Sequence, residues 1–222
     1  MKIAYIGSER GTSLHRAKAL ERLDHEVMII DPWAWLKVSS LASRWLIFLG
    51  AVGNGIMVNK KILDEIHQFK PNLIFVNQGE FLEKSLIQSL KEEGYRIANY
   101  MEDNPFVFHS GFRFINFLRA LPYYDLIAMR AVRCEFAKKN GAKNVLPVWM
   151  SADEIAHAPR ELSAEEKMEY SSEVAFIGTW MPERGAIMAE LIEKGVPLSI
   201  WGDRWHKAPE WKIIEPHWRG PG

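Results

Sequence analysis

Short apolar runs of four or five residues alternate along this chain with segments whose apolar residues recur every three or four positions. The continuous runs predict buried β-strands, and the periodic segments predict amphipathic helices. Because the runs are largely apolar instead of alternating, they are typical of a parallel sheet that helices cover on both faces. Six strands are expected before residue 150, over residues 3–6, 27–30, 73–76, 97–101, 126–129 and 145–148.

Helices are expected between these strands, and several of their ends carry recognisable signals. Thr12 or Ser13 is a candidate N-cap for the first helix, and Asn59 is a candidate for another. Gly94 and Gly141 follow the last apolar positions of their helices, where a left-handed residue commonly ends a helix. Six strands with helices between them suffice for one complete doubly wound, Rossmann-like α/β domain.

The pattern changes after residue 150. Residues 151–172 are rich in charge and poor in large apolar residues, which indicates a linker or a solvated helix. Residues 173–222 then predict one β-α-β unit, with a strand that ends at Gly178, a helix that ends at Gly195 and a strand over 198–201. Two strands and one helix bury little core, so we expect this part either to dock on residues 1–150 or to be the start of a longer second domain.

Composition excludes some classes of protein. Lys plus Arg and Asp plus Glu each number 28, so the net charge is zero and offers no general attraction to nucleic acid. Cys134 is the single cysteine, which excludes an internal disulfide. The seven histidines show no ligand spacing, so we expect neither a metal nor another cofactor.

One apolar segment is relevant to whether the protein enters or contacts a membrane. Trp45–Val58 spans only 14 residues and contains three glycines, whereas a spanning helix needs about 20 apolar residues. The N-terminus also lacks the apolar core and cleavage site of a signal peptide. We therefore expect a cytoplasmic protein with no transmembrane segment, and association of Trp45–Val58 with a membrane surface stays open.

The first candidate site is the loop between the first strand and the first helix. Free backbone N–H groups at such a junction can hold an anion or contact a substrate. Asp31, at the end of the second strand, would suit the ribose of a nicotinamide dinucleotide, but the Gly-x-Gly-x-x-Gly pattern fails at Glu9 and Thr12. A tight turn and a substrate loop stay open as alternatives. The candidate residues are Gly7, Arg10, Gly11, Thr12 and Ser13.

Two carboxylates follow the third and fourth strands. Glu80 and Asp103 would lie at the carboxyl edge of a parallel sheet, where ligands of such sheets bind. A carboxylate there can accept a proton from a substrate hydroxyl, or simply cap the next helix. Asp103 is the stronger catalytic candidate, because Asn104-Pro105 fixes a turn directly behind it.

The second strand–glycine–helix junction predicts a phosphate site. Gly178 and Thr179 end a strand, Pro182 suits the first turn of a helix, and Arg184 lies one turn inside it. Backbone N–H groups, a hydroxyl and a guanidinium can together hold a diphosphate. No Gly-Lys-Ser/Thr follows, so the junction is not a P-loop.

Several short motifs, in this order and spacing, are shared with a known family. They are Ile3–Gly7, Gly11–Ala17, Leu23–Val27, Asp103-Asn104-Pro105, Tyr124-Asp125, Val174–Thr179 with Glu183-Arg184, and Ile200-Trp201-Gly202. On these residues the chain resembles the glycosyltransferase-like family that includes the spore maturation protein CgeB. The resemblance covers the whole chain. It implies the GT-B architecture, with two facing Rossmann-like domains.

The resemblance also implies roles for the two parts. The N-terminal domain would bind a glycan, lipid-linked or protein acceptor through Gly7–Ser13 and the region of Asp103. The C-terminal domain would bind a nucleotide-sugar donor through Gly178, Thr179 and Arg184. The family's C-terminal domain is longer than residues 173–222, so the resemblance implies a fragment that lacks the acidic residues that hold the donor ribose.

We therefore expect a glycosyltransferase that moves a sugar from a nucleotide diphosphate to an acceptor hydroxyl. Asp103 would act as base if the reaction inverts the anomeric centre, and a retaining reaction would need no protein base. A non-catalytic glycan- or protein-binding module of the same fold is the alternative, and a nicotinamide oxidoreductase is a third. The sugar, the nucleotide, the acceptor and the oligomeric state stay open.

Overall fold

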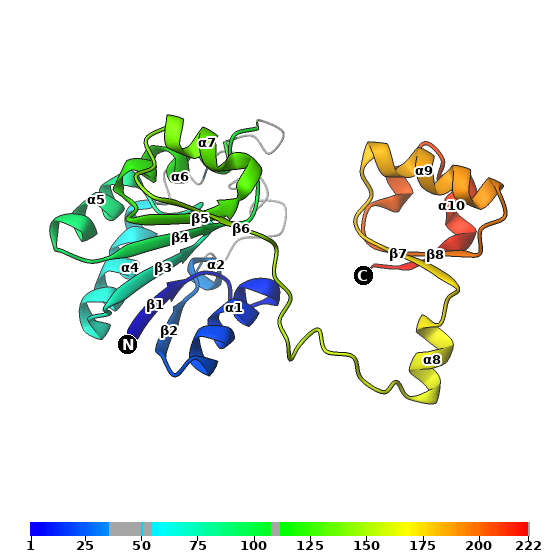
Figure 1. Ribbon diagram of the computed structural model, residues 1–222, viewed down its shortest axis with the longest axis horizontal. Helices are drawn as coiled ribbons and strands as arrows, with labels where there is room; N and C mark the ends of the chain where they lie inside the picture. Colours follow the sequence, from blue (N-terminus) through cyan, green and yellow to red (C-terminus); the bar gives the residue numbers. More distant parts are fainter. Residues whose placement is uncertain (36–49, 51–54, 108–111, 222) are drawn as a thin grey trace. The chain divides into compact units, whose positions relative to one another are not determined.

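Six parallel strands form one sheet in the first part of the chain, in the order β2-β1-β3-β4-β5-β6 (Figure 1). The computed structural model describes residues 1–35, 50, 55–107 and 112–221. The chain divides into two units, Met1–Ala158 and Pro159–Gly222. The strands of the first unit are β1 (Lys2–Ile6), β2 (Glu26–Ile30), β3 (Leu73–Asn77), β4 (Ile97–Met101), β5 (Leu126–Arg130) and β6 (Val145–Val148). The predicted six-stranded parallel sheet is confirmed.

The helices of the first unit cover both faces of this sheet. Helix α1 lies on one face, and α4, α5, α6 and α7 lie on the other (Figure 1). The strand order changes direction at β1, which pairs with β2 on one side and β3 on the other. The helices are α1 (Gly11–Arg22), α2 (Pro32–Trp35), α4 (Gly55–Phe69), α5 (Lys84–Glu92), α6 (Ile115–Ala120), the 3-10 turn η2 (Leu121–Tyr123) and α7 (Ala131–Lys139).

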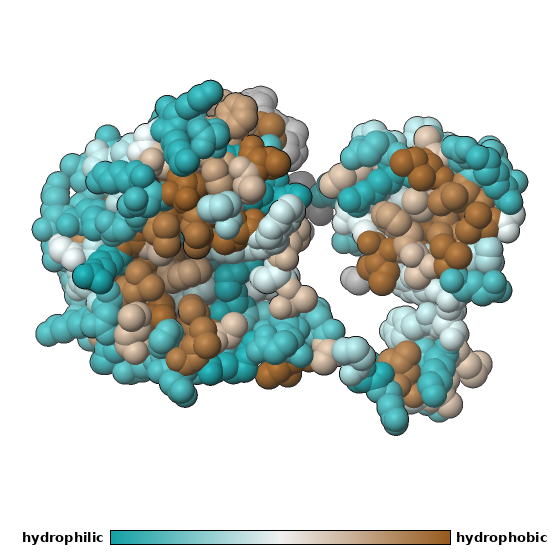
Figure 2. Space-filling model, viewed as in Figure 1, coloured by the Kyte–Doolittle hydropathy of each residue, from teal (hydrophilic) through white to brown (hydrophobic). Residues whose placement is uncertain are grey.

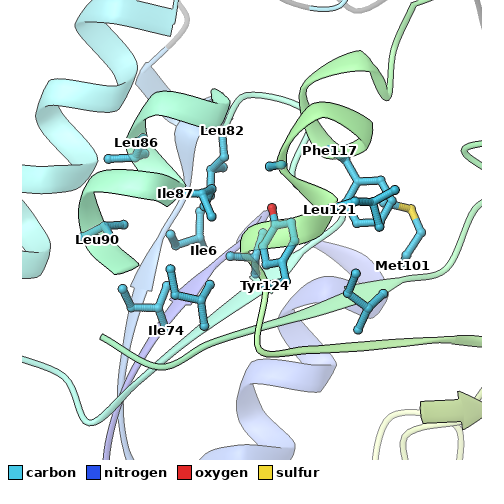
Figure 3. Packing of buried hydrophobic residues seen from close by; sticks show 14 of the residues in the cluster. Ile6, Ile74, Leu82, Leu86, Ile87, Leu90, Met101, Phe117, Leu121 and Tyr124 are labelled. Atoms are coloured by element: carbon cyan, nitrogen blue, oxygen red, sulfur yellow. The ribbon is translucent and has the colours of Figure 1, made fainter. Parts of the chain in front are cut away.

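The main core lies between the sheet and the helices on the α4–α7 face. Figure 3 shows Ile6, Ile74 and Met101 from the strands meeting side chains of α5, α6 and η2. Each buried Leu or Ile of this kind stabilises the fold by about 2 kcal/mol. The helix side chains in this layer are Leu86, Ile87, Leu90, Phe117 and Leu121.

The expected N-caps of two helices are wrong. Helix α1 begins at Gly11, after an extended Arg10 whose side chain caps nothing, so Thr12 and Ser13 lie inside the first turn. Asn59 lies inside α4, which begins at Gly55. Apolar periodicity locates the body of a helix, but a cap requires a particular backbone conformation just before it. The left-handed helix ends at Gly94 and Gly141 are confirmed, with φ of +89° and +98°.

The first unit continues past β6 because its last turn is attached to α1. Asp153 accepts hydrogen bonds from the N–H groups of Ile155 (3.0 Å) and Ala156 (2.8 Å). The Arg22 guanidinium of α1 binds Asp153 at 2.7 Å and Glu154 at 2.8 Å. These contacts hold the pKa of Asp153 below its usual range, with the Ala156 N–H as the largest cause and Arg22 the next.

The second unit has a three-stranded parallel sheet in the order β7-β8-β9. Helices α9 and α10 pack against each other beside this sheet (Figure 1). Its elements are α8 (Ala164–Tyr170), β7 (Val174–Ile177), α9 (Pro182–Glu193), β8 (Leu198–Trp201), η3 (Trp205–Lys207), α10 (Trp211–Ile214), η4 (Glu215–His217) and β9 (Trp218–Gly220). A second parallel sheet confirms the expected second Rossmann-like part.

Strand β9 was not expected from the sequence, because it has only three residues and a charged one at its centre. With β9 in place, the unit buries a small core of its own around Ile200, Trp205 and Ile214. Helix α8 lies in the segment expected to be a linker or a solvated helix. It buries no residue, and a capping box between Ser163 and Glu166 holds its start.

No helix in the described part of the chain is long and apolar enough to cross a membrane. Most of the apolar segment Trp45–Val58, on which the expected membrane-surface association depends, lies outside the described residues.

Candidate functional site

A cavity of about 190 Å³ lies at the carboxyl ends of β1 and β3, where the strand order changes direction. Open α/β sheets bind their ligands at this position, because the loops after two neighbouring strands lead away on opposite faces there. The lining residues include Ile6, Gly7, Thr12, Asn77, Glu80 and Arg113. Two separate predictions, the loop after the first strand and Glu80, therefore meet in one place.

Gly7 starts the loop, and only glycine fits there. A Cβ at this position would lie 2.7 Å from the Ser13 hydroxyl and 2.9 Å from Asn77 Cβ. Beneath the loop, the hydroxyls of Tyr5 and Ser13 form a buried hydrogen bond of 3.2 Å, and burial raises the pKa of Tyr5. Because position 7 has no side chain, the loop passes close to Asn77 at the end of β3, and its backbone faces the cavity.

The five loop residues have different positions. Gly7 and Thr12 line the cavity, while Ser13 is buried below it. Arg10 and Gly11 are exposed and are absent from its lining. A polar, largely backbone surface at the start of α1 therefore faces the cavity.

Asp31 has a structural role that the nicotinamide alternative did not foresee. One of its carboxylate oxygens accepts the Glu9 N–H at 3.0 Å, and the other accepts the Trp33 N–H at 2.8 Å. Both oxygens are thus engaged with the backbone, and the residue attaches the Gly7–Ser13 loop to the end of β2. This arrangement disfavours a ribose-binding role for Asp31.

Arg113 joins the two candidate catalytic carboxylates. Its guanidinium binds Glu80 through Nε at 3.2 Å and Nη2 at 2.7 Å, and Asp103 through Nη1 at 3.0 Å. Sequence reasoning missed Arg113, because no motif surrounds it and it lies 33 residues from Glu80. The sheet brings Glu80 and Asp103 together because they follow the adjacent strands β3 and β4.

The two carboxylates differ in accessibility. The Glu80 side chain is only 8% exposed, whereas that of Asp103 is 45% exposed. Glu80 thus holds Arg113 from below, and Asp103 faces solvent. The backbone between β3 and Glu80 is strained, because Gln78 has a positive φ of +69°. The Gln78 amide also lies 3.5 Å from Asp103.

Arg16 is a second guanidinium that the sequence did not single out. It donates to Asn77, lies 3.4 Å from Glu102 and packs 3.9 Å over the ring of Tyr100. A third guanidinium, from Arg133, donates to the Glu102 carbonyl at 2.8 Å. The carboxylate oxygens of Glu80, Glu102 and Asp103 are acceptors that could bind the hydroxyl groups of a ligand.

An aromatic wall completes the first site. Trp33 and Phe81 line the cavity, and their rings meet edge to face with centroids 4.4 Å apart. Such rings can pack on the C–H face of a sugar while neighbouring polar groups bind its hydroxyls.

Side-chain hydrogen bonds stabilise the second strand–glycine–helix turn, at Gly178. The carbonyl of Gly178 accepts the Trp205 indole N–H at 2.9 Å, and the carbonyl of Thr179 accepts Arg184 Nη1 at 2.7 Å. Arg184 also packs over the Phe176 ring at 5.7 Å. All three predicted donor residues therefore belong to one connected turn.

Helix α9 begins at this turn without a side-chain cap. Its N-cap residue, Met181, is extended, and Pro182 occupies the first turn as the sequence predicted. N–H groups at such a helix start attract an anion, although Glu183 places a negative charge in the same turn. A ligand phosphate would have to lie on the side of Arg184.

Across the described residues, no group of three or more His, Cys, Asp and Glu side chains is arranged to hold a metal ion. The positive groups near the two turns include the guanidiniums of Arg16, Arg113 and Arg133 in the first unit and of Arg184 in the second.

No protein-family model and no curated protein matches the sequence. Solved structures do match its fold. MnaA from S. aureus, solved with UDP, has a TM-score of 0.59 at 14% identity, over 97% of this chain and 65% of that one. The UDP-GlcNAc 2-epimerase from Neisseria meningitidis, bound to UDP-GlcNAc, has a TM-score of 0.57 at 11% identity, over 100% and 71%.

A trehalose-6-phosphate synthase matches with a TM-score of 0.54 at 12% identity, over 98% of this chain and 67% of that one. These likenesses show the GT-B type of fold, with two Rossmann-like parts. The chain spans about two thirds of the length of the structures it matches. The narrower resemblance to the family of CgeB stays a prediction.

Proposed function

We propose that this chain takes part in glycosyl transfer from a nucleotide-diphosphate sugar to an acceptor hydroxyl. The observation that carries the proposal is the repeated strand–glycine–helix turn, at Gly7 and Gly178, where two helices start without a side-chain cap. One turn lies beside carboxylates suited to hydroxyl groups, and the other lies beside a guanidinium suited to a diphosphate. The likeness to structures that hold UDP and UDP-GlcNAc supports the same function.

On the donor side, the backbone of Gly178 and Thr179 and the start of α9 would face the diphosphate. Arg184 has more N–H groups than the one it gives to Thr179, so it can bind a phosphate oxygen without releasing the turn. Positive groups and a helix start can stabilise the departing diphosphate without a metal ion.

On the acceptor side, Asp103 is the proposed base. An acceptor oxygen would attack the anomeric carbon as the bond from that carbon to the diphosphate oxygen breaks. The diphosphate leaves with the bonding electrons, and the acceptor proton passes to the Asp103 carboxylate. This role applies to an inverting reaction. Glu80 would instead hold Arg113 in place, since its side chain is nearly buried.

The test of the donor site is a thermal-shift titration of the chain with UDP, GDP and dTDP. A nucleotide at 100 times its dissociation constant stabilises the folded state by about 2.7 kcal/mol. We expect Arg184→Ala to remove the shift. Lys194→Ala is the matched control, because it removes a positive charge at the opposite end of the same helix. Failure of all three nucleotides, or an equal loss in both variants, would contradict the donor site.

One observation favours a second candidate, a glycan-binding module without catalysis. Arg113 neutralises both candidate bases, which suits binding more than proton transfer. Release of nucleotide from a donor sugar by the wild-type chain, but not by Asp103→Asn, would favour the transferase. No release by the wild-type chain would favour the binding module, and release that Asp103→Asn leaves unchanged would exclude Asp103 as the base.

A further inference from the structure

An apolar groove of about 490 Å³ runs between α6 and α7 in the first unit, and no step of the proposed reaction uses it. Its described walls are apolar except for Asn140. The loop after β4, the start of α6 and one face of α7 each contribute to it. The residues that matter most are Pro105, Phe106, Val107, Phe114, Leu118 and Phe136.

Several large apolar side chains in this groove are open to solvent. Phe136 is 58% exposed and Val107 is 40% exposed. The rings of Phe106 and Phe136 lie 5.9 Å apart, so the loop after β4 and α7 meet along one wall. Figure 2 shows apolar side chains, mixed with hydrophilic ones, on the visible face of the first unit. A contiguous exposed apolar surface of this kind is typical of a binding site.

The groove adjoins the carboxylate cluster through the contact between Arg113 and Phe114. Asp103 is two residues before Pro105, and Arg113 immediately precedes Phe114. The Arg113 guanidinium packs over the Phe114 ring at 4.7 Å, so one residue of the cluster touches one wall of the groove. A single ligand can therefore contact hydroxyl-binding groups at one end and hydrocarbon at the other.

We infer that the acceptor is an amphipathic molecule, with a hydroxyl end at Asp103 and Arg113 and a hydrocarbon part in the apolar groove. This inference rests on the proposed function and names its acceptor class. No charged side chain stands among the described walls of the groove, so a polar sugar would lose hydration there without gaining hydrogen bonds. A hydrocarbon chain would gain from the same surface.

The test uses methyl, hexyl and octyl β-D-glucopyranoside, with the hexyl and octyl compounds kept below their critical micelle concentrations. Binding to the whole chain is followed by the NMR shifts of the Ile115 and Leu118 methyl groups, which border the groove. Full burial of a methylene tightens binding about fourfold. The groove is open on one side, so we expect the dissociation constant to fall about twofold per methylene.

Two variants separate the two ends of the ligand. Phe136→Ser should reduce the gain in affinity per methylene, because it removes one apolar wall of the groove. Val132→Ser is the matched control, because Val132 lies on the same helix, is 77% exposed and is absent from the described walls. Asp103→Asn should weaken the hexyl and octyl compounds by the same factor, about tenfold for one hydrogen bond to a charged group.

Absence of chain-length dependence in the wild type, or an undiminished dependence in Phe136→Ser, would overturn the groove as the hydrocarbon site. An unchanged affinity in Asp103→Asn would overturn the position of the hydroxyl end. The nucleotide titration is a separate readout. If the groove binds alkyl chains but no nucleotide stabilises the protein, the result contradicts the proposed function and still supports the groove as a hydrocarbon site.

Discussion

The turns after β1 and β7 have nearly the same backbone. In each, a glycine N–H binds the last carbonyl of the neighbouring strand, Gly7 to Ile30 at 3.0 Å and Gly178 to Trp201 at 2.9 Å. The residue before the helix has φ −137° and ψ 155° at Arg10, and φ −136° and ψ 154° at Met181. Neither helix has a side-chain cap. The two units therefore share one local design.

The surroundings of the two turns differ. β1 lies between β2 and β3, so its turn meets residues that follow β3 and β4. β7 is at the edge of the described sheet and pairs with β8. Its turn therefore meets an aromatic pair, Phe176 and Trp205, and the guanidinium of Arg184. The first turn faces paired carboxylates and guanidiniums from the loops after β3 and β4, whereas the second faces aromatic rings and Arg184, which indicates that strand neighbours decide what each turn can bind.

The largest effect is expected from Gly202→Ala in the second unit. A Cβ there would lie 2.1 Å from the Gly178 carbonyl oxygen, and φ is +138°. Overlap with backbone and an unfavourable φ together cost about 4 kcal/mol. Amide NMR should show the resonances of residues 174–220 at unfolded positions, while those of the first sheet stay. Gly195→Ala is the control, with φ +79° and open space, and should cost only about 1 kcal/mol.

Gly7→Ala is expected to destabilise the first unit by about 3 kcal/mol, because its Cβ would meet three side chains, of which Tyr5 and Asn77 cannot move freely. Urea unfolding measures the loss. Gly11→Ala is the matched control in the same loop, since φ is +54° but no atom lies within 4 Å. Equal losses in the two variants would contradict close packing as the reason for glycine at position 7.

Tyr5→Phe should cost about 1 kcal/mol, because it removes the buried hydrogen bond to Ser13 beneath the first turn. A double-mutant cycle with Ser13→Ala checks the origin of the loss. The double variant should be about as stable as either single variant. Additive losses would mean that the two hydroxyls stabilise the fold independently of each other.

The smallest effect is expected from acidification, which should weaken the hydrogen bonds of the last turn of the first unit. The folded-state pKa of Asp153 lies below its unfolded value, so its contribution is present above about pH 4 and is lost as pH falls through the folded pKa. The amide resonances of Ile155 and Ala156 should shift in that acidic range. Asp153→Asn should make these positions insensitive to pH, and retention of the transition would assign it to another group.

Much of the fold could be predicted from local pattern. Ile3–Ile6 is a continuous apolar run because helices cover both faces of its sheet. The burial of this strand could therefore be predicted from its residue types. Gly94 marks a helix end because few other residues adopt its left-handed backbone. The pattern failed at Thr12, Ser13 and Asn59, where capping depends on the exact first turn of a helix.

The candidate site was only partly predictable. Gly7 and Glu80 could be chosen because residues after parallel strands meet at one edge of the sheet. Arg113 and Arg16 could not, since an arginine in a helix or loop is ordinarily a solvated surface residue. The stabilising role of Asp31 was also hidden, because a carboxylate that binds backbone N–H groups looks the same in sequence as one that binds a ligand.

Local pattern was enough to predict the parallel sheets, the succession of their strands along the chain and the two glycine turns, because these depend on periodicity and backbone freedom within a few residues. The folded structure was needed to show that Arg113 bridges Glu80 and Asp103, that β9 completes the second sheet and that an apolar groove adjoins the carboxylates. These features join residues from different strands and helices. Their pairing is set by strand order and packing, which local pattern does not encode.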